Sequence, residues 1–190
     1  DNLVIMGMGE PLANYENLLK ALRILNAPWG GGIGARKITI STSGLAPQIR
    51  KLADEPLQFR LAISLHGATD ETRNQIMPVN RKYPLRELTA ACEHYQQKTG
   101  RLISFEYILI AGVNDGELAD LLDYARGVGA ELRFIEYMDV GGATHWNPDR
   151  VVSRARMLAQ LQTRLGKVRE LPRTDSAPAD RFELGDGTTF

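Results

Sequence analysis

Small and polar residues recur directly after short apolar runs in this sequence, a pattern typical of a ligand site. The first apolar run, 2–6, is followed by Gly7-Met8-Gly9-Glu10-Pro11. Ser41-Thr42-Ser43-Gly44 and Ser64-Leu65-His66-Gly67 come after later runs. Glycines let a backbone approach a ligand closely, a carboxylate binds a cation, and hydroxyls donate to a carboxylate or a ribose. These residues indicate a pocket for a small ligand with a positive charge.

Each of these clusters also has a purely structural interpretation. Glu10 can cap the helix that follows it, and a serine- and threonine-rich segment is an ordinary helix N-terminus. His66 can be a neutral histidine whose ring nitrogens bond to the backbone. Asn114-Asp115, before Glu117, has the composition of a helix cap. Taken one at a time, both interpretations stay open.

Apolar periodicity predicts the elements that would position these residues. Continuous or alternating apolar runs predict strands, and apolar residues repeating every three or four positions predict helices. The predicted strands are 2–6, 37–40, 60–65, 103–110 and 131–136, and the predicted helices are 16–25, one beginning near Pro47, 85–98, 117–126 and 151–165.

Strands that alternate with helices in this way predict an α/β fold with a parallel sheet. Ligands gather at the carboxyl ends of parallel strands, and all the polar clusters follow strands, including 112–115 and 137–139. We therefore expect one site at one edge of the sheet. The tail differs, because 181–184 and 188–190 flank Gly185-Asp186-Gly187 and predict a hairpin. The expected organisation is an α/β domain with a parallel sheet over 1–165 and an extension over 166–190.

Composition excludes several classes of protein. The chain has 190 residues, 23 basic and 23 acidic side chains, and a net charge of zero, which argues against a strong nucleic-acid footprint carried by this segment. No apolar stretch approaches the length of a membrane span, so we expect no membrane partner and a cytoplasmic location. The single cysteine, Cys92, excludes an internal disulfide framework and a self-contained site of several thiolates. We expect Cys92 to be a small core residue.

The motifs together resemble radical S-adenosylmethionine enzymes. They are Gly-Met-Gly-Glu-Pro (7–11), Ser-Thr-Ser-Gly (41–44), Ala-Ile-Ser-Leu-His (62–66), Pro-Val-Asn-Arg-Lys-Tyr (78–83) and Glu106-Tyr107 with Gly-Val-Asn-Asp (112–115). Their order and spacing over residues 1 to about 115 are similar to the dual-specificity 23S rRNA/tRNA adenine carbon-2 methyltransferases.

From about residue 112 onward the sequence resembles a second family of the same superfamily, the GTP 3′,8-cyclases of molybdenum cofactor synthesis. The segments that carry this likeness are Gly-Val-Asn-Asp (112–115), 132–144 and 175–179. The shared 112–115 segment is where the two likenesses meet. Both imply a partial (β/α) barrel of the radical S-adenosylmethionine type, here expected to be truncated at both ends.

The resemblance implies a role for seven residues of this chain. Glu10, with the Gly9 backbone, would hold the amino group of S-adenosylmethionine. Ser41 and the segment of Ser64, Leu65 and His66 would lie near its carboxylate or ribose. Met138 would approach the adenine.

The family also implies a [4Fe–4S] cluster bound by Cys-x₃-Cys-x₂-Cys, and none of those thiolates is in this chain. We expect them upstream of Asp1, and further functional cysteines downstream of Phe190. The leading hypothesis is the core of an adenine carbon-2 methyltransferase with rRNA and tRNA as partners. The alternatives are a GTP cyclase and an inactive S-adenosylmethionine-binding or scaffold fragment. The sequence predicts neither the oligomeric state nor the catalytic residues.

Overall fold

The structure is a computed structural model that describes residues 2–101, 103–127, 132–139, 146–173 and 179–190. Its contacts divide the chain into two compact units, Asp1–Phe105 and Glu106–Phe190. The sequence placed a boundary at residue 165 instead, and that assignment of domains stays a prediction.

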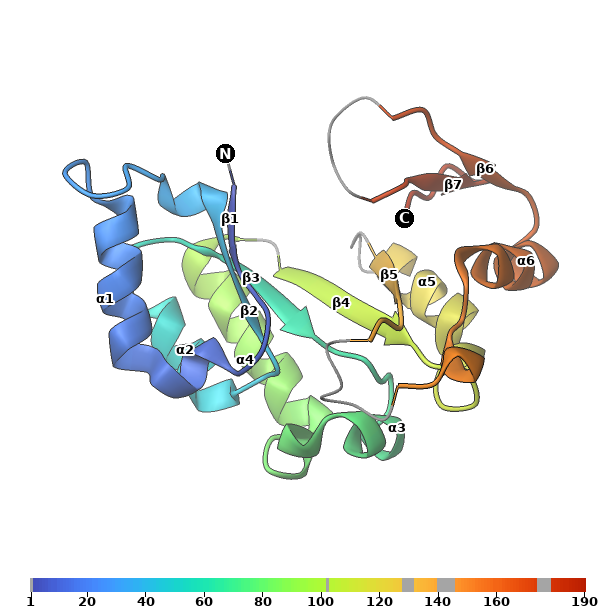
Figure 1. Ribbon diagram of the computed structural model, residues 1–190, viewed down its shortest axis with the longest axis horizontal. Coiled ribbons are helices and arrows are strands. Elements are labelled where there is room, and N and C mark those ends of the chain that lie inside the picture. The colour runs from blue at the N-terminus through green and yellow to red at the C-terminus, as the bar shows by residue number, and fades with distance from the viewer. Residues whose placement is uncertain (1, 102, 128–131, 140–145, 174–178) are drawn as a thin grey trace. The chain divides into compact units, whose positions relative to one another are not determined.

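The first unit alternates strands and helices along the chain (Figure 1). Its elements are β1 (Leu3–Ile5), η1 (Pro11–Asn14), α1 (Tyr15–Asn26), η2 (Ala35–Lys37), β2 (Ile38–Thr42), α2 (Ala46–Ala53), β3 (Arg60–Ser64), α3 (Asp70–Ile76), η3 (Pro78–Arg81) and α4 (Leu85–Thr99). β4 (Ile103–Leu109) begins in this unit. The sheet order is β1-β2-β3-β4-β5, where β5 is Leu132–Glu136, and β1, β2 and β3 are paired in parallel.

The core of the first unit follows the apolar periodicity. α1 buries Leu18, Leu19 and Leu22 on one face, and β2 contributes Ile38 and Ile40, which are fully buried. α2 lies between α1 and α4 in Figure 1. Because the strands run parallel, the carboxyl ends of β1, β2 and β3 lie at one edge of the sheet, and the loops after them start there.

The second unit holds the rest of β4, then η4 (Asp115–Glu117), α5 (Leu118–Gly127), β5 (Leu132–Glu136), η5 (Pro148–Arg150), α6 (Arg154–Leu165), β6 (Val168–Glu170) and β7 (Phe182–Leu184). α5 and α6 pack against each other. β6 and β7 pair antiparallel, and the chain after β7 turns back so that Phe182 and Phe190 exchange backbone hydrogen bonds.

The predicted α/β fold and the terminal hairpin are confirmed. Three details differ from the predictions. α6 begins at Arg154 rather than Val151, because Ser153 caps it by accepting a hydrogen bond from the Arg156 amide. β6 and α3 were not predicted, since each is too short to show a clear period. Residue 131 of a predicted strand, and residues 140–144 and 175–178 of the cyclase-like segments, lie outside the described part of the chain.

Candidate active site

A cavity of about 490 Å³ lies at the carboxyl edge of β1, β2 and β3. This volume is in the range of ligand pockets for small molecules. Its walls come from the turn after β1, the end of β2 and the end of β3, and Met77 closes it from the end of α3. The lining residues are Ile5, Met6, Gly7, Met8, Gly9, Glu10, Pro11, Asn14, Ser41, Thr42, Ser43, Ser64, His66 and Met77.

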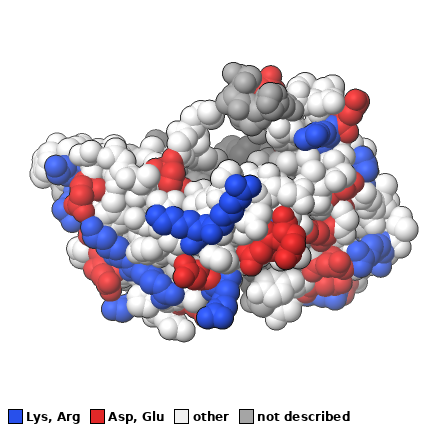
Figure 2. Space-filling model, turned by 90° about the horizontal axis from the view of Figure 1, so that it is seen from below, with Lys and Arg blue, Asp and Glu red and all other residues white. Residues whose placement is uncertain are grey.

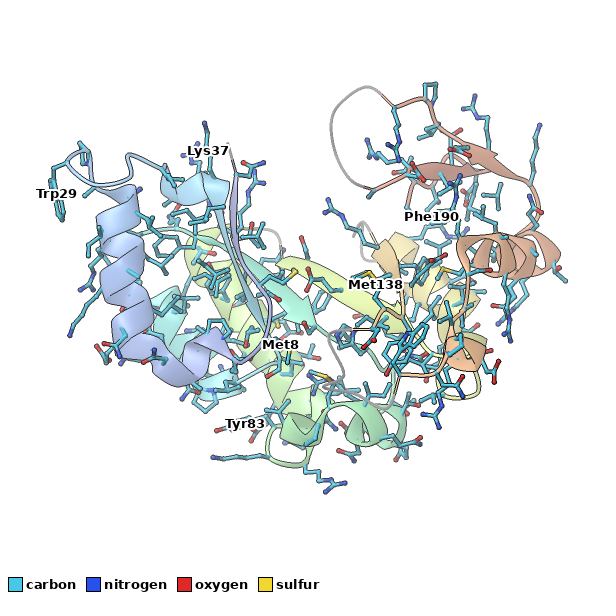
Figure 3. The ribbon with its side chains drawn as sticks, viewed as in Figure 1. Met8, Trp29, Lys37, Tyr83, Met138 and Phe190 are labelled. Carbon is cyan, nitrogen blue, oxygen red and sulfur yellow. The ribbon has the colours of Figure 1, made fainter. Side chains whose placement is uncertain are left out.

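The turn after β1 has a backbone that suits glycine. Gly7 and Gly9 have φ angles of +134° and +99°, a region that other residues rarely adopt. A Cβ atom at either position would meet no atom within 4 Å. The space beside the turn is therefore open, and Met8, labelled in Figure 3, projects from it with 77% of its surface exposed. The turn presents bare backbone to the cavity.

Glu10 ties this turn to the end of β2. Its Oε1 accepts hydrogen bonds from the Leu12 amide and from Thr42 Oγ1, both at 2.9 Å. Its Oε2 accepts from the Ser43 amide at 2.6 Å and from Ser43 Oγ at 2.7 Å. The carboxylate thus caps η1, as the structural interpretation of the sequence predicted, and also fixes one wall of the cavity. Four donors occupy about all the lone-pair sites of a carboxylate.

Arg73, on α3, lies behind this wall and is completely buried. Its Nε donates to the Leu65 carbonyl at 2.9 Å, its Nη1 to Asn80 Oδ1 at 2.7 Å, and its Nη2 to the Ser43 carbonyl, with a longer contact to the Ser64 carbonyl at 3.4 Å. Burial lowers the pKa of this guanidinium, but arginine keeps its charge in proteins. A buried cation therefore holds the backbone of two strand ends.

Most of the predicted site residues come together at this cavity. Gly9, Glu10, Ser41, Ser64 and His66 all line it. His66 is buried and has a φ of +57°, the only described residue other than glycine with a positive φ. This is uncommon backbone geometry, which tends to occur at functional sites.

Two of the predicted site residues do not line this cavity. Leu65 is not among the lining residues, and its carbonyl accepts the Arg73 hydrogen bond instead. Met138 belongs to the second unit, where 62% of its surface is exposed. The role of Met138 beside an adenine stays a prediction.

Sequence reasoning missed the role of Arg73, Asn80 and Met77. Asn80 stands in the segment 78–83 that carried the family resemblance, but nothing in the local pattern marks Arg73 as buried. Asn114 also differs from expectation. Its side chain accepts from the Ile110 amide and donates to the Ile108 carbonyl, so it fastens the end of β4.

The second unit has a cavity of its own, about 470 Å³, between α5 and α6. Two arginines of its lining form ion pairs, Arg156 with the partly buried Asp115 at 2.9 Å and Arg164 with the exposed Asp120 at 2.6 Å. Gln160 also lines it, and its buried Oε1 has no hydrogen-bond partner among the residues that the structure describes.

The residues of this chain do not fit an iron–sulfur cluster. Cys92 is buried on α4, and burial raises the pKa of its thiol to about 12, which keeps it protonated near neutral pH. Among the described residues, no group of three or more His, Cys, Asp or Glu side chains is placed to hold a metal ion. The prediction that Cys92 is a core residue is confirmed.

The first cavity, in contrast, fits the chemistry of S-adenosylmethionine. The space beside Gly7 and Gly9 is open, and the lining offers a carboxylate, several hydroxyls and the thioethers of Met6, Met8 and Met77.

No helix in the described part of the chain is long and apolar enough to cross a membrane.

Comparisons with known proteins agree with this chemistry. Residues 1–125 match the family model described as the radical SAM superfamily. The chain is 53% identical over 166 residues to the "Probable dual-specificity RNA methyltransferase RlmN 3" of Opitutus terrae, covering 86% of this chain and 44% of that protein. It is 45% identical over 161 residues to the corresponding protein of Thermoanaerobacter sp., covering 83% of this chain and 47% of that protein. The chain thus spans about half the length of these relatives.

A solved structure is also similar. It is a radical SAM methyltransferase from Sphaerobacter thermophilus, with a TM-score of 0.73 and 44% identity over 85% of this chain and 47% of that chain. The 86% coverage by the Opitutus protein means that this similarity continues beyond residue 115, into the segment that resembles the cyclases. The cyclase likeness of 112–190 stays a prediction. The family match, the parallel α/β sheet and the cavity at its carboxyl edge lead to one conclusion: the chain belongs to the radical SAM superfamily.

Proposed function

We propose that the cavity in the first unit binds S-adenosylmethionine. The observation that carries this proposal is the convergence of three strand ends on one space lined by bare glycine backbone, a carboxylate and hydroxyl groups. The ligand's ammonium group pairs with the negative charge of Glu10 and the carbonyls of the Gly9 turn. Its carboxylate and ribose accept from, or donate to, Ser41 and the Ser64–His66 segment.

The hydrogen bonds of Glu10 give this proposal a specific form. Because four donors already surround the carboxylate, a ligand ammonium takes the place of one of them. The Ser43 hydroxyl is the donor that can turn away at least cost, since rotation about one bond releases it, whereas the Leu12 and Ser43 amides are held by the backbone. Ligand binding thus exchanges a neutral hydroxyl for a cation.

We further propose that the whole protein methylates carbon 2 of adenine in rRNA and tRNA. This rests on the similarity to proteins named as dual-specificity RNA methyltransferases and to a radical SAM methyltransferase structure. Bound S-adenosylmethionine supplies the methyl group and, beside a [4Fe–4S] cluster, the radical chemistry. The cluster ligands do not come from the described residues, so this chain's own contribution is to bind and orient S-adenosylmethionine.

Calorimetric titration of the chain with S-adenosylmethionine tests the binding proposal. Replacing Glu10 by alanine removes a charge-assisted contact and releases the wall at Ser43, so we expect the affinity to fall by about 10- to 100-fold. Glu16→Ala is the matched control, because Glu16 is an exposed glutamate paired with Lys51 outside the cavity. Equal affinity in the wild-type and Glu10→Ala chains would contradict the assignment.

The reaction itself needs the complete protein. The gene's full reading frame is expressed, and the purified enzyme is incubated without oxygen with S-adenosylmethionine, a one-electron reductant and either rRNA, tRNA or GTP. We expect 2-methyladenosine in the RNA, detected by mass spectrometry, and much less of it from the Glu10→Ala enzyme at an S-adenosylmethionine concentration near the wild-type Kd. Conversion of GTP with no methylated RNA would show instead the cyclase activity that 112–190 resembles.

A further inference from the structure

Arg73 is completely buried, and within the described residues its guanidinium donates to backbone carbonyls and to one side-chain amide oxygen. In the described part of the chain, no carboxylate lies within ion-pair distance of its guanidinium. Surface charges elsewhere are paired or mixed, and Figure 2 shows Lys and Arg interleaved with Asp and Glu on the face in view. A buried arginine without a carboxylate partner is costly, so its oxygen ligands must be well placed.

Two glycines make room for this side chain. A Cβ at Gly44 would lie 3.2 Å from Arg73 Nη2, and one at Gly67 would lie 2.7 Å from the Arg73 amide nitrogen. Gly44 follows the end of β2, and Gly67 follows the end of β3. The backbone at Gly67 therefore lies closer to Arg73 than a residue with a side chain would allow, whereas a Cβ at Gly44 would make a tight contact with Arg73 Nη2 and with Leu88.

The far side of the guanidinium is fixed as well. Asn80 Oδ1 accepts from Arg73 Nη1, and Asn80 Nδ2 donates to Asp70 Oδ1 at 2.8 Å and to Asn74 Oδ1 at 2.9 Å. Asp70 Oδ1 also accepts from the Leu85 amide at the start of α4. Arg73 thus joins the β2 and β3 ends to a rigid support made of α3, η3 and α4.

We propose that Arg73 is a positioning residue that sets the shape of the S-adenosylmethionine cavity by holding the carbonyls of Ser43, Ser64 and Leu65. This inference rests on the proposed function of the cavity. Ser43 is the link, because its carbonyl accepts from Arg73 while its amide and hydroxyl donate to Glu10. When Arg73 is lost, the Ser43 segment moves and the Glu10 carboxylate loses two of its four donors. Affinity for the ligand therefore falls more than stability alone would explain.

The test compares Arg73→Lys with Tyr95→Phe in the 190-residue chain. Lysine keeps the charge but cannot reach three separate oxygens with a planar fork. Tyr95 is also fully buried, and its hydroxyl donates to the Phe59 carbonyl at 2.8 Å, before the amino end of β3. Both variants lose buried hydrogen bonds to carbonyls, but only the hydrogen bonds of Arg73 hold residues of the cavity wall. Circular dichroism fixes a temperature at which both chains are folded.

At that temperature we expect the S-adenosylmethionine affinity of Arg73→Lys to fall by about tenfold or more, and that of Tyr95→Phe to stay within about twofold of wild type. Equal affinities in the two variants would overturn the proposal.

Amide hydrogen exchange at Ser43 gives an independent reading that needs no ligand. In Arg73→Lys we expect the protection of the Ser43 amide to fall by more than the change in global stability explains. In Tyr95→Phe we expect that protection to fall only as much as the change in that variant's global stability explains. If wild type binds no S-adenosylmethionine, the proposed function fails and exchange decides the role of Arg73: unchanged Ser43 protection in Arg73→Lys would overturn it.

Discussion

The two cavities of this chain have nearly the same volume but opposite chemistry. The cavity in the first unit is built by partly buried polar contacts that converge on Glu10 and on the buried Arg73. The groove between α5 and α6 in the second unit is lined by two half-exposed arginines that pair with the partly buried Asp115 and the exposed Asp120. Volume therefore says little about function, whereas the burial and convergence of the polar groups say a great deal.

The arginines of the two cavities also differ in burial. Arg73 is completely buried and bonded to oxygens at the cavity wall, so moving it moves the wall. About half of the Arg164 side chain is exposed, and water screens its pair with Asp120. Exposed ion pairs such as Arg164–Asp120 are common on protein surfaces and contribute little stability. A buried arginine, in contrast, fixes the backbone that supplies its hydrogen-bond acceptors in one arrangement.

Substituting one glycine in each cavity should give the largest difference in stability and in ligand affinity between the two cavities. Gly9→Ala places a side chain at a φ of +99°, a strain of about 1–3 kcal/mol that the turn relieves only by moving. We expect a lower free energy of unfolding and at least about tenfold weaker S-adenosylmethionine binding, measured by urea unfolding and calorimetry. Gly116→Ala, in the other cavity, meets no atom within 4 Å and should leave both quantities nearly unchanged. Similar losses in both variants would remove the distinction.

Acid should weaken the support of the first cavity through Asp70. Hydrogen bonds from the Leu85 amide and the Asn80 side chain hold the pKa of this carboxyl below its usual value. Since the folded pKa is lower than the unfolded one, the carboxylate stabilises the fold above about pH 4, and this contribution is lost as the pH falls through the folded pKa.

Asp70→Asn should therefore lower the free energy of unfolding by about 1 kcal/mol at pH 7 and by much less near pH 2. Urea unfolding of both chains at the two pH values measures the difference. A loss of equal size at pH 7 and pH 2 would show that the charge of Asp70 has no part in it.

The smallest effect is expected in the second cavity. Arg164→Ala removes one exposed ion pair, so the free energy of unfolding should change by less than about 0.5 kcal/mol. S-Adenosylmethionine affinity should not change, because Arg164 lies in the second unit and does not line the proposed site. Weaker binding in this variant, measured by the same calorimetry, would count against the first cavity as the ligand site.

Much of the fold and part of the site were predictable from the sequence. Strands and helices follow apolar periodicity, and parallel strands place their polar ends at one edge, so the clusters that hold Glu10, Ser41, Ser64 and His66 were predicted to lie together, and all four residues line the cavity. Arg73 was not, because burial of an arginine depends on acceptors that distant segments supply. Nor did the sequence indicate that Glu10 would be surrounded by four donors, since three of them come from Thr42 and Ser43, more than 30 residues away.

The central claim is that S-adenosylmethionine binds in the cavity of the first unit. Titration of the ¹⁵N-labelled chain with S-adenosylmethionine, followed by amide chemical shifts in NMR spectra, tests it most directly. We predict that the shifted amides are those of the three strand ends, at Gly7–Glu10, Ser41–Ser43 and Ser64–His66. Shifts confined to the α5–α6 groove, or no shifts at saturating ligand, would contradict the claim.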